Sequence, residues 1–265
     1  MKVMVVGSEG IVGRALINSF DTSLKNLSIC LVDPKVNKNT DISKMDLEEF
    51  EFIFLCLPTP TVGENVHDSK LIAQYLKKLD DYREAHQGLN STIVINSTTL
   101  INYANEPFDK LNIVYNPEFI SEANASDDFI NTELVVIGGN SINCLKLKRF
   151  YEKYTNINHQ AQYELVDIET AINFKYLRNL KQAWNVIFWE IAHDVTEGKS
   201  RKIRHMMDKL PVGENSIIGH DGYRGFGGMC LPKDVKALTN GTQSELPDET
   251  KTLLKALLTY NHNIK

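Results

Sequence analysis

Short runs of consecutive apolar residues alternate with longer amphipathic stretches over the first 140 residues of the chain. The apolar runs are KVMVVG (2–7), LSICLVD (27–33), FEFIFLCLP (50–58), STIVINS (91–97), LNIVY (111–115) and ELVVIGG (133–139). Runs rich in β-branched residues are typical of strands that are covered on both faces. The stretches 11–20 and 69–85 between these runs are compatible with helices. This alternation predicts an α/β fold with a doubly wound, mostly parallel sheet.

The pattern changes near residue 165. Residues 167–198 contain no proline, no glycine before Gly198, and apolar residues at a spacing of three to four. With Asp167 as its N-cap, this stretch predicts a helix of roughly 30 residues, or about 45 Å. A second amphipathic helix is predicted over 249–265. We therefore expect one domain over 1–164, and over 165–265 a helical domain built on a long central helix.

The composition favours a soluble globular protein without a metal site. Hydrophobic residues make up 42% of the 265 residues, charged residues make up 24%, and the net charge is -5. This charge does not favour binding to nucleic acid or to an anionic membrane, and no apolar run reaches the roughly 18 residues of a membrane span. The four cysteines show no metal-binding spacing. We expect Cys30 and Cys56 to be buried strand residues, Cys144 to be helical, and the location to be the reducing cytoplasm.

A glycine-rich turn follows the first apolar run. In VMVVGSEGIVGRAL the glycines are Gly7, Gly10 and Gly13, and the spacing is G-x-x-G-x-x-G, one residue longer than the common G-x-G-x-x-G. Such a turn lets backbone N–H groups, here including those of Ile11 and Val12, approach a pyrophosphate at a helix N-terminus. Glycine turns also follow strands where no ligand binds, so the turn alone leaves both interpretations open.

An acidic residue ends the second apolar run. Asp33 lies 20 residues after Gly13, where a carboxylate can bind the ribose hydroxyls of a dinucleotide and would repel a 2′-phosphate. Together with the glycine turn it predicts a Rossmann-type domain that binds NAD. Lys35 keeps NADP open as the alternative, and Asp33 could instead begin a turn with Pro34.

The stretch GFGGMCLPKD (225–234) places a thiol between three glycines and a Lys-Asp pair. Three glycines do not favour a helix or a strand interior. Cys230 is therefore a candidate nucleophile in a loop. Lys175 and Asn179 are four residues apart and share one helix face, although such a pair is usually a solvated surface.

Five segments in this order resemble the UDP-glucose/GDP-mannose dehydrogenase family of nucleotide-sugar 6-dehydrogenases. They are CLPTP (56–60), NSTTL (96–100), NPEFISEANASDDF (116–129), ETAINFKYLRN (169–179) and GFGGMCLPKD (225–234). The family typically carries P-T-P, K-S-T, N-P-E-F-L-x-E-G, Lys-x-x-x-Asn on a helix, and G-F-G-G-S-C-x-P-K-D. The resemblance extends from residue 1 to about residue 261.

The resemblance implies the oxidation of a primary alcohol to a carboxylate by two hydride transfers to two NAD molecules, with UDP-glucose as the expected substrate. A thiol would trap the aldehyde as a thiohemiacetal and then carry a thioester that water hydrolyses. The implied catalytic residues are Cys230 as nucleophile, Asp234 as proton-handling group, Lys175 and Asn179 as stabilisers of the oxyanion, Glu118 as an organiser of water, and Thr98 as a holder of water or of the reacting oxygen.

The resemblance also implies two sets of binding residues. The cofactor set is Gly7, Gly10, Ile11, Val12, Gly13, Asp33, Pro58, Thr59, Thr98, Glu122 near the nicotinamide, and Lys233. The substrate set is Glu118, Phe119, Ile120, Lys175, Asn179, Tyr223, Gly225, Phe226, Gly227 and Gly228. A homodimer through the long central helix is implied as well. The apolar side chains of Trp184, Phe188 and Trp189 could belong to that contact or to the core.

The chain departs from the family pattern at several positions. Met229 replaces a serine, Ala123 a glycine, Asn96 the lysine of K-S-T, and Ile217 an arginine. Family members usually continue into a third, nucleotide-binding domain, whereas this sequence ends at Lys265, so we expect a short form. Two other functions stay open: a two-electron hydroxyacid or alcohol dehydrogenase, which needs no Cys230, and a non-catalytic relative that binds NAD.

Overall fold

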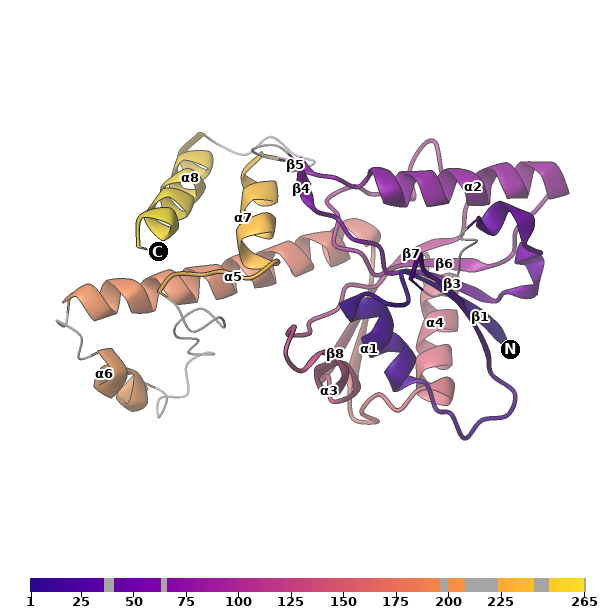
Figure 1. Cartoon of the computed structure of the whole chain (residues 1–265), viewed down its shortest axis with the longest axis horizontal. Helices are drawn as coiled ribbons and strands as arrows, with labels where there is room; N and C mark the ends of the chain where they lie inside the picture. The colour runs from indigo at the N-terminus through magenta and orange to yellow at the C-terminus, as the bar shows by residue number, and fades with distance from the viewer. Residues whose placement is uncertain (36–40, 63–65, 196–199, 208–223, 241–247, 265) are drawn as a thin grey trace. The chain divides into compact units, whose positions relative to one another are not determined.

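The structure of the chain is a computed structural model that describes residues 1–35, 41–62, 66–195, 200–207, 224–240 and 248–264 (Figure 1). The chain divides into two compact units. The first comprises Met1–Pro60 and Asp68–Lys175, and the second comprises Thr61–His67 and Tyr176–Lys265. The division therefore falls within a helix at Lys175, later than the expected domain boundary at 164.

The first unit contains a seven-stranded sheet in the order β2-β1-β3-β6-β7-β8-β9. Its strands are β1 (Lys2–Val6), β2 (Ser28–Val32), β3 (Phe52–Leu55), β6 (Thr92–Ile95), β7 (Ile113–Tyr115), β8 (Leu134–Gly139) and β9 (Gln162–Val166). All neighbours pair in parallel except β7 and β8, which are antiparallel. The doubly wound, mostly parallel Rossmann-type sheet is thus confirmed, and β9 is an edge strand that the apolar pattern did not predict.

Helices cover both faces of this sheet because its strands are apolar on both sides. Val3, Val5, Phe52 and Phe54 project to the face where α1 (Ile11–Ser19) and α4 (Ser141–Tyr154) pack into one apolar core. Helix α2 (Lys70–His86) lies on the opposite face (Figure 1). The helices expected over 11–20 and 69–85 are confirmed by α1 and α2.

Shorter elements complete the first unit. They are α3 (Ala125–Ile130) and two 3-10 helices, η1 (Ile42–Lys44) and η2 (Leu47–Glu49). Helix α4 is capped by Asn140, whose Oδ1 accepts the Asn143 N–H at 2.9 Å. Cys144 lies in α4 as expected and is buried.

The long helix is α5 (Ile168–Val195), which begins in the first unit and continues into the second. Asp167 caps it: one carboxylate oxygen accepts the Thr170 N–H at 2.8 Å and the other accepts the Thr170 hydroxyl at 2.7 Å. The predicted N-cap and the predicted long helix are confirmed over the described residues; Gly198 lies outside them.

The second unit also contains α6 (Ser200–Met207), α7 (Leu231–Asn240), α8 (Asp248–Asn263) and an antiparallel pair, β4 (Thr61–Val62) and β5 (Val66–His67). The expected C-terminal helix corresponds to α8. The apolar core of the second unit is formed by residues of α5, α7, α8 and the segment before α7: Ala183, Val186, Ile187, Phe226, Leu231, Val235 and Leu257.

Some expectations about single side chains need correction. Cys30 lies in β2 but is only half-buried, because β2 is an edge strand of the sheet. Cys56 is buried but follows β3 instead of lying within it. Trp189 is buried and Trp184 is exposed, so these two side chains do not share one environment. The side chain of Phe188 is not among those that the structure describes. No helix among the described residues is long and apolar enough to cross a membrane.

Candidate active site

The predicted cofactor-binding residues of the first unit follow the carboxyl ends of neighbouring parallel strands. The glycine turn follows β1, Asp33 follows β2, Pro58 and Thr59 follow β3, and Thr98 follows β6. β1 lies between β2 and β3, where the strand order reverses. In open α/β sheets, ligands bind at the carboxyl edge beside such a reversal.

Two glycines of the turn are required by close backbone contacts. Gly7 has a φ of +82°, and a Cβ on it would lie 2.2 Å from the carbonyl oxygen of Cys56. A Cβ on Gly13 would lie 2.2 Å from the carbonyl oxygen of Gly7. The turn therefore lies directly against β3 and the start of α1, as a close-packed phosphate-binding turn must.

The start of α1 suits an anionic ligand. Gly10 is the N-cap residue and offers no side chain, and none of the residues in the first turn is acidic. Unsatisfied N–H groups and the positive end of the helix dipole favour a phosphate at such a position. The hydroxyl of Ser8 is buried and has no hydrogen-bond partner among the described residues. These features fit the pyrophosphate of NAD.

Asp33 is linked to the glycine turn. Its carboxylate accepts the backbone N–H of Glu9 at 3.1 Å and that of Lys35 at 2.9 Å. One N–H of the turn is thus hydrogen-bonded to the residue expected to bind ribose. The adjoining Gly7 N–H donates to the Val32 carbonyl at 2.8 Å, which ties the turn to β2 as well.

The loops after β3 and β6 are tied to each other by two hydroxyls. Thr59 Oγ1 donates to the Thr98 carbonyl at 2.9 Å. Ser97 Oγ donates to the Leu55 carbonyl at 3.1 Å and accepts the Leu57 N–H at 2.7 Å. Thr59, Ser97 and Thr98 are buried. Ser97 was not singled out from the sequence, although it lies within the quoted NSTTL segment.

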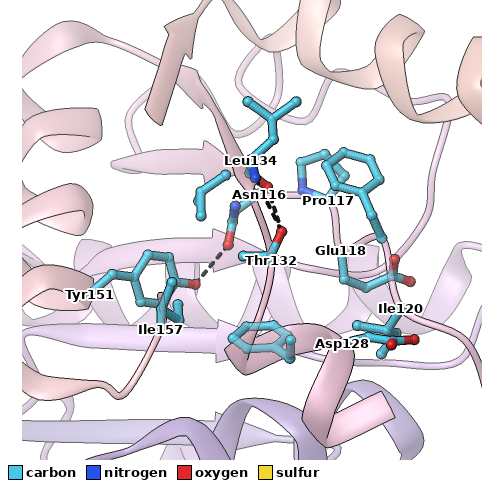
Figure 2. A pocket seen from close by; sticks show the side chains of 12 residues that line it. Asn116, Pro117, Glu118, Ile120, Asp128, Thr132, Leu134, Tyr151 and Ile157 are labelled. Atoms are coloured by element: carbon cyan, nitrogen blue, oxygen red, sulfur yellow. Dashed lines mark hydrogen bonds between the residues drawn. The ribbon is translucent and has the colours of Figure 1, made fainter. Parts of the chain in front are cut away.

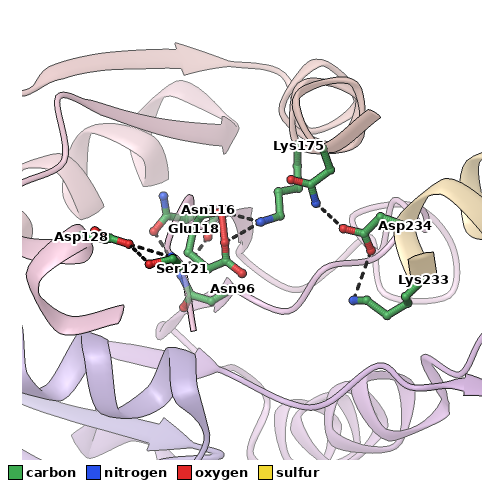
Figure 3. Close-up of polar contacts among 9 residues, drawn as sticks. Asn96, Asn116, Glu118, Ser121, Asp128, Lys175, Lys233 and Asp234 are labelled. Atoms are coloured by element: carbon green, nitrogen blue, oxygen red, sulfur yellow. Dashed lines mark hydrogen bonds and ion pairs between the residues drawn. The ribbon is translucent and has the colours of Figure 1, made fainter. Parts of the chain in front are cut away.

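Glu118 and Lys175 form a close ion pair in the first unit (Figure 3). Lys175 Nζ donates to Glu118 Oε2 at 2.5 Å and to the Glu118 carbonyl at 2.6 Å. The same Nζ lies 5.6 Å from the centre of the Phe119 ring, which meets Phe174 edge-on. A largely buried cation is thereby surrounded by a carboxylate, a carbonyl and an aromatic face, all of which stabilise positive charge.

A small, partly open pocket adjoins the segment that carries Glu118 (Figure 2). Apolar side chains form most of its lining. Asn116 and Tyr151 meet at one side of it, where the Tyr151 hydroxyl donates to Asn116 Oδ1 at 2.7 Å. Of the neighbouring predicted residues, Ile120 lines the pocket and packs against the core, whereas Glu122 is exposed.

In the second unit, Cys230 lies immediately before α7 with Asp234 in the first turn of the helix. The Asp234 N–H donates to the Cys230 carbonyl at 2.8 Å. The Asp234 carboxylate is buried, accepts a hydrogen bond from Asn179 Nδ2, and lies 3.2 Å from Lys233 Nζ (Figure 3). A helix N-terminus and a lysine both favour negative charge nearby. Cys230, Lys233, Asp234 and Asn179 therefore belong to one local arrangement.

The other cysteines are poor candidates for a nucleophile. Burial raises the pKa of the Cys56 thiol, and the Glu118 charge adds to the rise. Burial likewise raises the pKa of Cys144 to about 11 and raises that of Cys30. Thiols with raised pKa values are protonated at neutral pH, whereas the reactive form is the thiolate.

The glycine-rich stretch before Cys230 has a structural use beside the predicted one. Gly225 has a φ of +79°, and a Cβ on it would lie 2.5 Å from Asn261 Oδ1. Asn261 also accepts the Phe226 N–H at 2.6 Å and donates to the Phe226 carbonyl at 3.0 Å. The Phe226 side chain lies in the core of the second unit. Gly228, also with a positive φ, is exposed, and Gly227 is buried. Tyr223 and Ile217 lie outside the described residues.

The predicted catalytic residues thus fall into two local groups. Glu118 and Lys175 are together in the first unit, with Thr98 at the carboxyl edge of its sheet. Asn179, Cys230 and Asp234 are together in the second unit. Lys175 and Asn179 both lie on α5, one turn apart on the same face. No group of residues that could hold a metal ion is found in the described part of the chain.

Curated relatives and solved structures resemble the chain. It is 28% identical over 235 residues to the UDP-glucose 6-dehydrogenase of Rickettsia felis, and the match covers 84% of this chain and 50% of that protein. It is 26% identical over 259 residues to the UDP-glucose 6-dehydrogenase of Rickettsia bellii, covering 94% of this chain and 57% of that protein. The chain thus spans about half the length of the curated relatives that it matches.

Two solved structures share the fold. A UDP-D-ManNAc dehydrogenase from Pyrococcus horikoshii matches with a TM-score of 0.75 at 16% identity, over 100% of this chain and 69% of that one. A UDP-glucose dehydrogenase from Pyrobaculum islandicum matches with a TM-score of 0.76 at 16% identity, over 99% of this chain and 68% of that one.

A sequence model of the NAD binding domain of the UDP-glucose/GDP-mannose dehydrogenase family matches residues 17–157, more than half of the chain. Apart from Thr61–His67, the matched range lies in the first unit, and the glycine turn that fits NAD comes shortly before it. The chain therefore belongs to the UDP-glucose/GDP-mannose dehydrogenase family, with NAD as the cofactor of its first unit.

Proposed function

We propose that the chain carries out the NAD-dependent oxidation of a nucleotide sugar, converting a primary alcohol to a carboxylate, with UDP-glucose as substrate. The observation that carries this proposal is the arrangement around Cys230. A thiol lies at the start of α7, and a buried carboxylate in the same helical turn contacts both Lys233 and Asn179. A two-electron alcohol oxidation has no use for such a thiol.

The first unit would hold the cofactor through the residues that fit it. The glycine turn and the start of α1 would bind the pyrophosphate, and Asp33 would bind the adenosine ribose. NAD, when bound, accepts hydride from the carbon that is oxidised. Because Asp33 is acidic, we propose that NAD is preferred over NADP.

The thiol would allow both oxidations to occur at one carbon. The Cys230 sulfur adds to the aldehyde carbon, a C–S bond forms, and the aldehyde oxygen takes a proton. Loss of hydride and of that proton then leaves a thioester. Water adds to the thioester carbon, the C–S bond breaks, and the thiolate is regenerated. In total the alcohol and one water yield the carboxylate, two hydrides and three protons.

Charged side chains would assist at defined atoms. Lys175 and Asn179 would donate hydrogen bonds to the oxygen that becomes negative during addition to the carbonyl. Asp234 would exchange the proton of the thiol. Glu118 would orient the water that attacks the thioester and accept its proton. The ion pair with Lys175 at 2.5 Å holds the Glu118 carboxylate in place.

UDP-glucose is proposed because the relatives from Rickettsia felis and Rickettsia bellii carry the name UDP-glucose 6-dehydrogenase. The test is to incubate the purified chain with NAD and UDP-glucose and to measure NADH formed per sugar consumed. A ratio of two, together with uronic acid, supports the proposal. A ratio of one would indicate a two-electron dehydrogenase, and no turnover with UDP-glucose or GDP-mannose would indicate a non-catalytic NAD-binding relative.

The control variant is Cys230→Ser, which changes one atom in the thiol position. It is expected to bind NAD as the parent does and to form no uronic acid, because the serine hydroxyl does not provide a thioester. Acid formation at the parent rate would contradict the covalent route while leaving the NAD-dependent oxidation in place.

We further propose that the chain forms a homodimer through α5. The support is an apolar stripe on this helix, where Leu177 and Trp184 are 57% and 46% exposed. These two residues are seven apart and therefore share one face. Exposed large apolar side chains on one face favour contact with another surface.

A further inference from the structure

We infer that Asn116, held by Asn96 and Tyr151, is a positioning residue that determines where the Glu118 carboxylate lies. The inference rests on the proposed function, which gives Glu118 its role in thioester hydrolysis. It concerns a set of buried polar side chains to which the sequence assigned no role.

Asn116 directly follows β7 and is held through its side chain and its backbone. Its Nδ2 donates to the Val136 carbonyl at 2.7 Å. Its Oδ1 accepts the Tyr151 hydroxyl at 2.7 Å (Figure 2) and the Asn96 amide at 3.2 Å (Figure 3). The Asn116 carbonyl accepts the same Asn96 amide at 2.8 Å, and its N–H donates to the Ile95 carbonyl at 2.9 Å. Three strands and α4 therefore converge on one residue.

The partners of Asn116 lie in the interior of the first unit. Asn96 and Tyr151 are each 1% exposed. Burial raises the pKa of the Tyr151 hydroxyl, so it stays protonated and acts as a hydrogen-bond donor at neutral pH. A buried polar network whose hydrogen bonds are made specifies one arrangement, because each alternative leaves a buried group without a partner.

The position of Asn116 is transmitted to Glu118 along a short and stiff piece of chain. Only Pro117 lies between them, and its ring fixes φ. Beyond Glu118 the chain is tied again, because the N–H and hydroxyl of Ser121 donate to Asp128 Oδ2 at 2.8 and 2.5 Å (Figure 3). Glu118 therefore lies between two anchored points, where it meets Lys175.

The departure at Asn96 fits this arrangement. The family often has a lysine at this place in K-S-T, whereas here a planar amide donates to the carbonyl and the Oδ1 of Asn116. The Asn96 Oδ1 lies 3.8 Å from the Cys56 sulfur. An amide has both a donor and an acceptor for these partners, whereas a lysine has donors only.

The test is Tyr151→Phe, which removes one hydroxyl and keeps the ring. We expect the first hydride transfer to proceed at the parent rate, acid release to fall about fivefold, and the thioester on Cys230 to accumulate. Stopped-flow absorbance of NADH gives the first rate, and intact-protein mass spectrometry gives the acylated fraction. The matched control is Tyr154→Phe on the same helix, which is expected to behave as the parent does.

A double-mutant cycle with Glu118→Gln separates positioning of Glu118 from a general disturbance of the fold. If Tyr151 acts through Glu118, the fivefold effect disappears in the Glu118→Gln background. An equal effect in both backgrounds, or equal rates for Tyr151→Phe and Tyr154→Phe, would overturn the inference. Should Tyr151→Phe fail to fold, Asn96→Ser takes its place, because a serine hydroxyl is too short to reach the Asn116 carbonyl.

A second readout keeps this inference distinct from the proposed function. A parent chain that forms no acid with nucleotide sugars would contradict the proposed function alone. The carboxyl ¹³C chemical shift of Glu118, assigned with Glu118→Gln in labelled protein, would then decide. A shift that changes in Tyr151→Phe and not in Tyr154→Phe supports positioning, and an unchanged shift in both overturns it.

Discussion

Gly7 is set by its backbone conformation and by a close contact with the next strand. Its φ of +82° lies in the region that disfavours residues with a side chain, and a Cβ would meet the Cys56 carbonyl oxygen at 2.2 Å. Because Cys56 follows β3, which is central in the sheet, the carbonyl cannot move without disturbing the strand. The same turn carries the N–H groups proposed to bind the pyrophosphate, so stability and cofactor binding would depend on the same residue.

Gly7→Ala is therefore expected to lower the free energy of unfolding by about 2 kcal/mol or more and to weaken NAD binding at least about tenfold. Urea denaturation and calorimetric titration with NAD measure the two effects. Gly88→Ala is the matched control, because nothing lies within 4 Å of a Cβ at Gly88. Equal denaturation midpoints and equal NAD affinities for the two variants would contradict the argument.

At the scale of elements, the N-terminus of α5 depends on one charged cap. The backbone N–H of Thr170 and then its hydroxyl hold the pKa of Asp167 below its ordinary value. A carboxyl group whose pKa is lowered in the folded state stabilises the fold above its unfolded pKa of about 4. That contribution decreases once the pH falls below the unfolded pKa, and it is lost when the pH passes below the lower pKa of the folded state.

Asp167→Ala is expected to destabilise the chain by about 1 kcal/mol at pH 7, and the difference from the parent should shrink as the pH falls from about 4 to 3. Urea denaturation at several pH values measures it. Asn140→Ala is the matched control, because Asn140 caps α4 through an amide that does not titrate in this range. If the loss of unfolding free energy in Asp167→Ala does not depend on pH, as expected for Asn140→Ala, the charge of the cap does not contribute.

Elements with a clear apolar pattern could be predicted from the sequence. An exposed edge strand, and a helix that begins close after a glycine-rich stretch, could not. The six predicted strands are mostly apolar, whereas β9 alternates irregularly at an exposed edge, so its sequence QYELV gives no clear period. Helix α7 begins at Leu231, directly after the glycines that indicated a loop, because proline is tolerated in a first helical turn. The glycine turn and the cap at Asp167 could be predicted because each follows a recognisable pattern of residues close together in the chain.

The contacts of Tyr151 with Asn116 could not be predicted, since 35 residues separate them and no spacing rule joins them. The same holds for Asn261 and Phe226, whose hydrogen bonds explain Gly225 better than room for a ligand does. Motifs of the family thus locate the candidate residues, and the structure adds which of them are held by buried partners.

For the whole molecule, the predicted site residues are divided between the two units. Glu118 and the cofactor-binding turn belong to the first, and Cys230 and Asp234 belong to the second. Helix α5 is the element common to both, since Lys175 and Asn179 are one turn apart on it. Any surface that restrains α5 would therefore act on residues of both groups, which gives the proposed dimer a consequence for activity.

If the chain forms the proposed dimer, Trp184→Ser is expected to weaken self-association by about 30-fold or more, because a buried tryptophan at an interface often contributes about 2 kcal/mol. Sedimentation velocity over a range of concentrations measures the dissociation constant. Ile142→Ser is the control: Ile142 is 69% exposed on α4, in the first unit and away from α5 in sequence. A parent chain that sediments as a monomer at every concentration would contradict the proposed dimer, and equal weakening by Ile142→Ser would place the contact elsewhere than on α5.

If dimerisation also restrains α5, Trp184→Ser should lower the rate of acid formation at concentrations where the variant is monomeric and the parent is dimeric.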